Sequence, residues 1–95
     1  MQITEKTVAI VTGGASGLGA ATATAFAAHG AKVTIFDMNP DFGEQKAAEI
    51  GAEFKAVDVS DANQVAHAVK AVEKAHSDLH ILVNCAGIGP ASKTV

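Results

Sequence analysis

Residues 8–19 read Val8-Ala-Ile-Val-Thr-Gly-Gly-Ala-Ser-Gly-Leu-Gly19, and this stretch decides the fold. A β-branched run passes through a glycine-rich turn directly into an alanine-rich helical pattern. The first peptide N–H groups of a helix have no partner within the helix, and glycines let an anion approach them closely. The stretch therefore predicts a site for the phosphates of a nucleotide, with Gly13, Gly17 and Gly19 in its loop.

The spacing of the glycines distinguishes between several nucleotide-binding loops. It fits T-G-x-x-x-G-x-G, filled by Thr12, Gly13, Gly17 and Gly19, and it does not fit G-x-G-x-x-G in either frame. A P-loop needs Gly-Lys-Ser/Thr after its spacer, but the next lysine along the chain is Lys32. The loop therefore does not favour hydrolysis of a nucleoside triphosphate.

Apolar runs alternate with helical patterns along the whole chain, which indicates βαβ units and a parallel sheet. The expected strands are residues 7–12, 32–37, 53–58 and 79–84. The expected helices are residues 17–29, 40–50 and 61–76. Gly30 and Gly51 end the first two helices, and Ser60 is the expected N-cap of the third. Because such crossovers are right-handed, we expect an α/β, Rossmann-like sheet of strand order 3-2-1-4 with helices on both faces. In a sheet of this order the cofactor is expected at the switch point between the first and fourth strands.

Asp37 ends the second expected strand, 20 residues after Gly17. A carboxylate at this place can accept hydrogen bonds from both hydroxyls of an adenosine ribose. A 2′-phosphate there would meet a like charge, neither Gly14 nor Met38 supplies a cation, and the chain contains no arginine. The pattern therefore favours NAD over NADP. The alternative is that Asp37 caps the next helix or is a solvated residue at the end of a strand.

Composition bears on the other partners. The net charge of −3, the pI near 5.7 and the scattered lysines indicate neither nucleic acid nor an anionic membrane as a partner. Residues 1–6 contain no basic segment followed by a hydrophobic run, and the one cysteine cannot form an intrachain disulfide. We expect a cytoplasmic setting, with an organellar one as the alternative. His76 and His80 are four residues apart, but Ser77 and Asp78 interrupt the helix between them, so no metal site is expected.

A second motif ends the fourth expected strand and reads Asn84-Cys-Ala-Gly87. With both motifs in this order, the chain from Thr7 to Val95 resembles the short-chain dehydrogenase/reductase family, in which the second motif is usually N-N-A-G. Together with Ala91-Ser-Lys-Thr94, the motifs look most like those of the type 2 3-hydroxyacyl-CoA dehydrogenases, also called 17β-hydroxysteroid dehydrogenases type 10. The resemblance implies an NAD-dependent oxidoreductase that acts on a secondary hydroxyl or ketone, of hydroxyacyl-CoA or hydroxysteroid type, in a homo-oligomer such as a tetramer.

The resemblance also implies individual cofactor contacts beyond the three glycines and Asp37. These are Ser16, Leu18, Asp58, Val59, Cys85, Ala86 and Gly87. Asp58 would accept from the adenine amino group and Val59 would pack on the ring, although by chemistry alone Asp58 could equally cap the following helix. Cys85 stands where the family has a second asparagine, and a small buried hydrophobe is the alternative interpretation. Asn84 is expected to be structural, bonding nearby loop backbone.

The sequence contains no tyrosine, whereas members of the family use Ser and Tyr-x-x-x-Lys from beyond the N-N-A-G strand. We therefore expect no catalytic residue within these 95 residues and interpret the chain as the NAD-binding first half of a larger doubly wound domain. The alternative is a complete small protein that binds NAD or an adenine nucleotide without turnover. The edge of the fourth strand distinguishes the two, because an unprotected apolar edge invites association with another chain.

Overall fold

A computed structural model describes residues 3–13, 17–76 and 79–84 of the chain. Strands and helices alternate in the order that the sequence predicts. Their bounds are β1 Val8–Thr12, α1 Gly17–Ala28, β2 Lys32–Asp37, α2 Pro40–Ile50, β3 Glu53–Ala56, α3 Ala62–His76 and β4 Ile81–Asn84.

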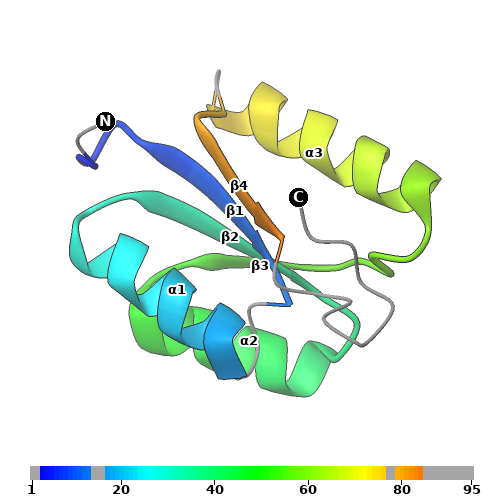
Figure 1. Cartoon of the computed structure of the whole chain (residues 1–95), viewed down its shortest axis with the longest axis horizontal. Coiled ribbons are helices and arrows are strands. Elements are labelled where there is room, and N and C mark those ends of the chain that lie inside the picture. The colour runs from blue at the N-terminus through cyan, green and yellow to red at the C-terminus, as the bar shows by residue number, and fades with distance from the viewer. Residues whose placement is uncertain (1–2, 14–16, 77–78, 85–95) are drawn as a thin grey trace.

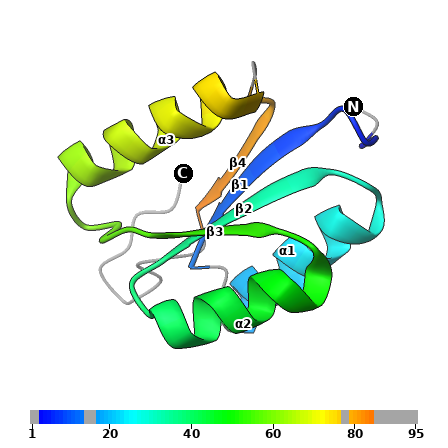
Figure 2. The same cartoon turned by 180° about the vertical axis from the view of Figure 1, so that it is seen from behind.

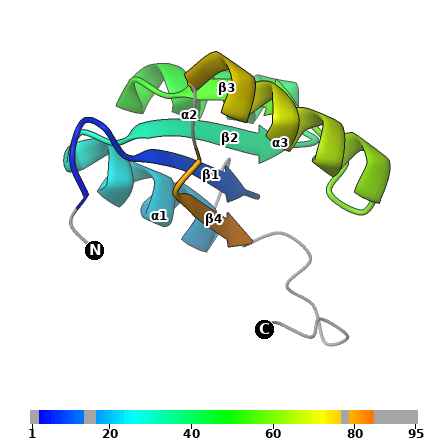
Figure 3. The ribbon, with the colours of Figure 1, turned by 90° about the horizontal axis from the view of Figure 1, so that it is seen from above.

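The four strands form one parallel sheet in the order β3-β2-β1-β4, which confirms the predicted topology. Figure 3 shows this order along the sheet. β1 is central, with Ala9 opposite Val33 of β2 on one side and opposite Ile81 of β4 on the other. All five residues of β1 are buried, as expected for a strand that is covered on both faces.

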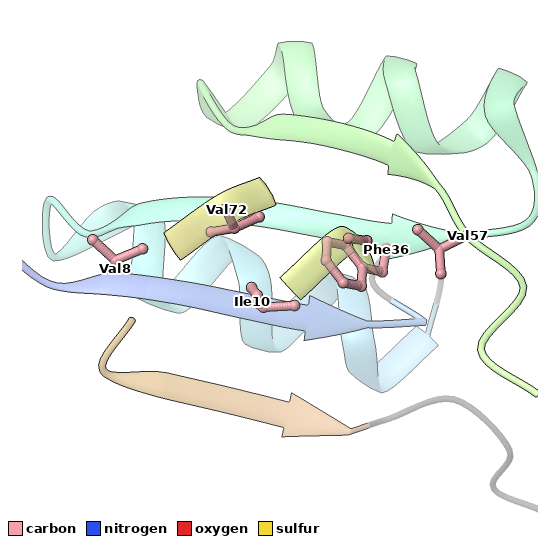
Figure 4. Packing of buried hydrophobic residues seen from close by; sticks show 6 residues of the cluster. Val8, Ile10, Phe36, Val57 and Val72 are labelled. Atoms are coloured by element: carbon pink, nitrogen blue, oxygen red, sulfur yellow. The ribbon is translucent and has the colours of Figure 1, made fainter. Parts of the chain in front are cut away.

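Helices cover the two faces unequally, with α1 and α2 on one side and α3 on the other (Figures 1 and 2). Alternate residues of the strands supply two separate cores because successive side chains point to opposite faces. The core under α3 contains Val8, Ile10, Phe36, Val57, Ala68 and Val72 (Figure 4). The core under α1 and α2 contains Val11, Ala23, Val33, Ile35 and Ala47.

Three strand boundaries differ from the prediction, the smallest difference being at β1, which begins at Val8 instead of residue 7. β3 ends at Ala56 instead of residue 58, because its partner β2 ends at Asp37, which lies opposite Ala56. β4 begins at Ile81 instead of residue 79. Just before it, His80 donates its N–H to the carbonyl of Val8 at 3.0 Å and accepts the Val8 N–H on Nδ1 at 3.1 Å.

Glycines end the first two helices, as predicted. After α1, Gly30 has φ +89°, its N–H donates to Ala27, and the next N–H, of Ala31, donates to Phe26. These two bonds form a Schellman motif. After α2, Gly51 has φ +73° and donates its N–H to the carbonyl of Ala47. Both glycines supply the left-handed backbone that turns the chain back toward the sheet.

Candidate functional site

The carboxyl ends of β1, β2 and β3 are tied together at one edge of the sheet. Gly13, directly after β1, donates its N–H to the carbonyl of Phe36 in β2 at 2.7 Å. Val57, directly after β3, donates its N–H to the carbonyl of Asp37 at 3.1 Å. Two backbone hydrogen bonds therefore place the start of the glycine loop, the end of β2 and the end of β3 side by side.

The glycine loop leaves this edge and enters α1. Gly13 has φ +68° and Gly17 has φ +60°, a region that L side chains rarely adopt. A Cβ built at Gly17 would meet nothing within 4 Å, so open space lies beside the backbone at the start of α1. The first N–H groups of the helix belong to Gly17, Leu18 and Gly19 and have no carbonyl one turn earlier within α1.

These residues differ in exposure and in hydrogen bonding. Leu18 is 68% exposed, whereas Gly19 is buried against the sheet. The N–H of Gly13 is already bonded to β2, so Gly13 would contribute a close approach of backbone, while the start of α1 would contribute donors. Ser16 lies outside the described residues, and its role stays a prediction.

Asp37 is the last residue of β2 and is partly buried. Its Oδ1 accepts the N–H of Asn39 at 3.0 Å, which holds the carboxylate at the edge of the sheet. The alternative that Asp37 caps the next helix is wrong, because Asn39 is the N-cap of α2. The Oδ1 atom of Asn39 accepts the N–H groups of Asp41 and Phe42 at 3.1 and 3.2 Å.

Asp58 and Val59 follow β3 at the same edge. Oδ1 of Asp58 accepts the N–H of Ser60 at 3.0 Å and the hydroxyl of Ser60 at 2.6 Å. Both hydrogen bonds lower the pKa of Asp58 below its ordinary value, the bond from the Ser60 hydroxyl more than the bond from its N–H. The carboxylate is therefore charged at neutral pH. Val59 is partly buried and packs against the core under α3.

The cap of α3 differs from both expectations. Ser60 was predicted to cap the helix, and Asp58 was the alternative. Instead Oδ1 of Asp61 accepts the N–H groups of Asn63 and Gln64 at 3.0 and 3.2 Å. The Ser60 hydroxyl instead donates to Asp58, and Asp61 is the residue directly before the first residue of α3, Ala62.

The end of β4 reaches the same edge from the other side of β1. Asn84 lies opposite Thr12, and the Thr12 hydroxyl donates to the carbonyl of Val83 at 3.3 Å. The pairing brings Asn84, the first residue of the second motif, beside Thr12, the first residue of the first motif. The predicted cofactor contacts Cys85, Ala86 and Gly87 lie outside the described residues and stay predictions.

Two polar residues of this edge were missed at the level of sequence. Asn39 fixes the turn after Asp37, and the signal for it is an asparagine directly before a helix-initiating proline, Pro40. Gln64 accepts the N–H of Asp58 on Oε1 at 3.0 Å. Its signal is the D-x-x-Q spacing from Asp61, which is typical of a capping box.

One histidine of the described chain contacts an acid at the opposite edge of the sheet, where β3 begins. His76 Nε2 is 3.2 Å from Glu53 Oε1, which joins the end of α3 to the start of β3. Within residues 3–13, 17–76 and 79–84, no group of three or more His, Cys, Asp or Glu side chains could hold a metal ion. None of the helices described is both long and apolar enough to cross a membrane.

Comparison with known proteins adds three findings. The family model for short chain dehydrogenases matches residues 7–95. The chain is 42% identical over 84 residues to short-chain dehydrogenase reductase 5 of Arabidopsis thaliana, covering 85% of the chain and 32% of that protein. It is 40% identical over 92 residues to the 3-hydroxyacyl-CoA dehydrogenase type-2 of Drosophila melanogaster, covering 95% of the chain and 36% of that protein.

Among solved structures, a metagenomic short-chain oxidoreductase in complex with NADP superposes with a TM-score of 0.85 at 32% identity. The match covers 94% of this chain and 42% of that one. The chain thus spans about a third of the length of the curated relatives that it matches.

Proposed function

The chain belongs to the short chain dehydrogenase family, and on this premise we propose that it is the NAD-binding half of an oxidoreductase that acts on a secondary alcohol or a ketone. One observation carries the proposal. A left-handed glycine turn, the start of a helix and the carboxylate of Asp37 meet at neighbouring strand ends, joined by the 2.7 Å bond from Gly13 to Phe36. This juxtaposition provides donors for a diphosphate and an acceptor for the ribose beside it.

The choice of NAD rests on Asp37. Its carboxylate accepts the N–H of Asn39 on Oδ1, which fixes it at the end of β2, where it would accept from the two ribose hydroxyls. A 2′-phosphate in the same position would bring two negative charges together. The metagenomic short-chain oxidoreductase of similar fold was solved in complex with NADP, and the residue at the end of β2 is the part of this chain that would decide between the two cofactors.

The adenine would lie against Asp58 and Val59. The carboxylate of Asp58 would accept from the adenine amino group, and the lowered pKa of Asp58 keeps it an acceptor at neutral pH. The three neighbouring strand ends would then each hold one part of the cofactor: diphosphate at β1, ribose at β2 and base at β3.

Bound NAD would accept a hydride from a substrate carbinol carbon, and that chemistry belongs to the cofactor. The residues of this chain would bind and orient the cofactor, with Ser16, Cys85, Ala86 and Gly87 as further proposed contacts. A hydroxyacyl-CoA or hydroxysteroid substrate is proposed from the motifs, and the relative from Drosophila bears a name of that class. A cytoplasmic homo-oligomer completes the proposal.

Titration calorimetry of the chain with NAD and with NADP tests the cofactor assignment. We expect NAD to bind at least about ten-fold more tightly than NADP. Asp37→Ala should remove most of this difference, because it lowers the affinity for NAD and removes the charge repulsion against the 2′-phosphate of NADP. Asp41→Ala is a matched control, because it removes a carboxylate on the adjoining helix α2. Equal affinity of the unmutated chain for both cofactors would refute the interpretation of Asp37.

The sequence that follows Val95 tests the catalytic half of the proposal. A Ser and a Tyr-x-x-x-Lys encoded after Val95 support a dehydrogenase, since these groups would move the proton that accompanies hydride transfer. A stop codon directly after Val95, together with NAD binding by the chain, would favour the binding module without turnover.

A further inference from the structure

The chain leaves the sheet between Val57 and Asp58. Val57 donates its N–H to the carbonyl of Asp37 at 3.1 Å, so the next N–H, of Asp58, points to the other side, where the described sheet has no further strand. Gln64 accepts this N–H of Asp58 on Oε1 at 3.0 Å. A side chain of α3 thus supplies the partner of the Asp58 N–H at this edge.

Gln64 occupies the third position of α3, where a capping-box residue normally reaches back to the N–H of the N-cap. Here the N–H of the N-cap, Asp61, is already donated to the carbonyl of Asp58 at 2.9 Å. Gln64 reaches three residues further back, and its Nε2 donates to Oδ2 of Asp61 at 3.4 Å. One amide side chain therefore bridges both ends of the turn 58–61.

The same turn carries the proposed adenine contacts. Ser60 holds the carboxylate of Asp58 from inside the turn, and Gln64 holds the backbone of Asp58 from α3. We propose that Gln64 is a positioning residue that fixes Asp58 and Val59 against the base, and so sets the preference of the site for adenine. This inference rests on the proposed function.

Base discrimination is the property that such positioning controls. The amino group of adenine can donate to a carboxylate, whereas hypoxanthine carries a carbonyl oxygen at the same place and would repel it. A site whose acceptor is held in place rejects a base that lacks the donor. If Asp58 can move, it no longer opposes the carbonyl, and the two bases bind more equally.

The experiment compares ADP with inosine diphosphate by titration calorimetry on the full chain. We expect wild type to prefer ADP by at least about ten-fold, and Gln64→Met to reduce the preference to about two-fold. Gln64→Glu keeps an acceptor for the Asp58 N–H but loses the donor to Asp61, so its preference should lie between those of wild type and Gln64→Met. Asn63→Ala is the matched control, because Asn63 is the exposed preceding residue of the same helical turn.

Hydrogen exchange at Asp58 and the nucleotide affinities together distinguish positioning by Gln64 from a structural role. Amide hydrogen exchange should show a protected Asp58 N–H in wild type and in Asn63→Ala, and faster exchange in Gln64→Met. If Gln64→Met weakens both nucleotides by the same factor, Gln64 is merely structural and the positioning role is overturned. If wild type binds both nucleotides equally well, Asp58 does not read the base and the role is again overturned. If wild type binds neither ADP nor NAD, the proposed function itself fails.

Discussion

Replacing Gly17 by alanine tests two roles of this glycine: its left-handed backbone, which affects stability, and its missing side chain, which would leave room for the ligand. Gly17 has φ +60°, so an alanine there is strained, yet its Cβ would touch nothing within 4 Å in the unliganded chain. Gly51 is a matched position at the end of α2, with φ +73° and equally open surroundings. The two substitutions therefore impose the same kind of strain, and only one of them lies at the proposed diphosphate site.

The magnitudes follow from these geometries. A left-handed backbone costs an L residue about 1–2 kcal/mol, and no packing clash adds to this at either site. For a domain of this size a loss of 1 kcal/mol lowers Tm by roughly 4–8 °C. At Gly17 the added methyl would also occupy the space through which the proposed diphosphate would approach, so NAD should lose at least about ten-fold in affinity, equivalent to about 1.4 kcal/mol.

Thermal unfolding followed by circular dichroism measures the first effect, and calorimetry with NAD at a temperature where both variants are folded measures the second. Gly17→Ala and Gly51→Ala should lower Tm alike, while only Gly17→Ala weakens NAD. Unchanged NAD affinity in Gly17→Ala would refute the placement of the diphosphate. An equal loss of affinity in Gly51→Ala would show that the effect acts through stability.

Three further predictions concern packing, charge and the open edge of the sheet. A Cβ on Gly43 would overlap the ring of Phe54, so Gly43→Ala should destabilise the chain by about 1–3 kcal/mol in denaturant unfolding, and Phe54→Leu should relieve most of that cost. Ser60→Ala should raise the pKa of Asp58 toward its ordinary value in an NMR titration. Because the pKa is lowered in the fold, the contact stabilises the wild type above the unfolded-state pKa, and this contribution is lost as pH falls through the folded-state value. The variant should therefore be less stable than wild type at neutral pH, and the difference should disappear as pH falls. Leu82 is 52% exposed on β4, the terminal strand of the described sheet, so the chain should self-associate in sedimentation velocity and Leu82→Lys should reduce association; a stable, cooperative wild-type monomer would contradict this.

Much of the fold was predictable because local and topological rules agree. Glycine stops fixed the ends of the first two helices, and right-handed crossovers fixed the strand order. The length of β3 was not predictable from its own residues, because the ladder stops where β2 stops, at Asp37. The cap of α3 was also missed, since Ser60 and Asp61 are both good N-caps and the choice depends on which of them directly precedes the first helical residue, Ala62.

The candidate site was predictable to the level of which residues share an edge. Strand order alone brings the ends of neighbouring strands together, so Gly13, Asp37 and Asp58 could be grouped from sequence. Their individual hydrogen bonds could not, because Asn39 and Gln64 act through turns whose geometry depends on the docked helices. A sequence pattern identifies the donors and acceptors available, whereas the folded backbone decides which of them are already used.

The position of β1 has a consequence for how the protein is made. β1 pairs with β2 on one side and with β4 on the other. The separation along the chain between paired residues, for example from Ala9 to Ile81 compared with Ala9 to Val33, is about three times longer for β4. Closing the longer connection costs about 1 kcal/mol more in chain entropy by the logarithmic scaling of loop closure. On the ribosome, β1, β2 and β3 can assemble while β4 is still unsynthesised. The backbone groups of β1 that pair with β4 therefore have no strand partner until residues 81–84 emerge.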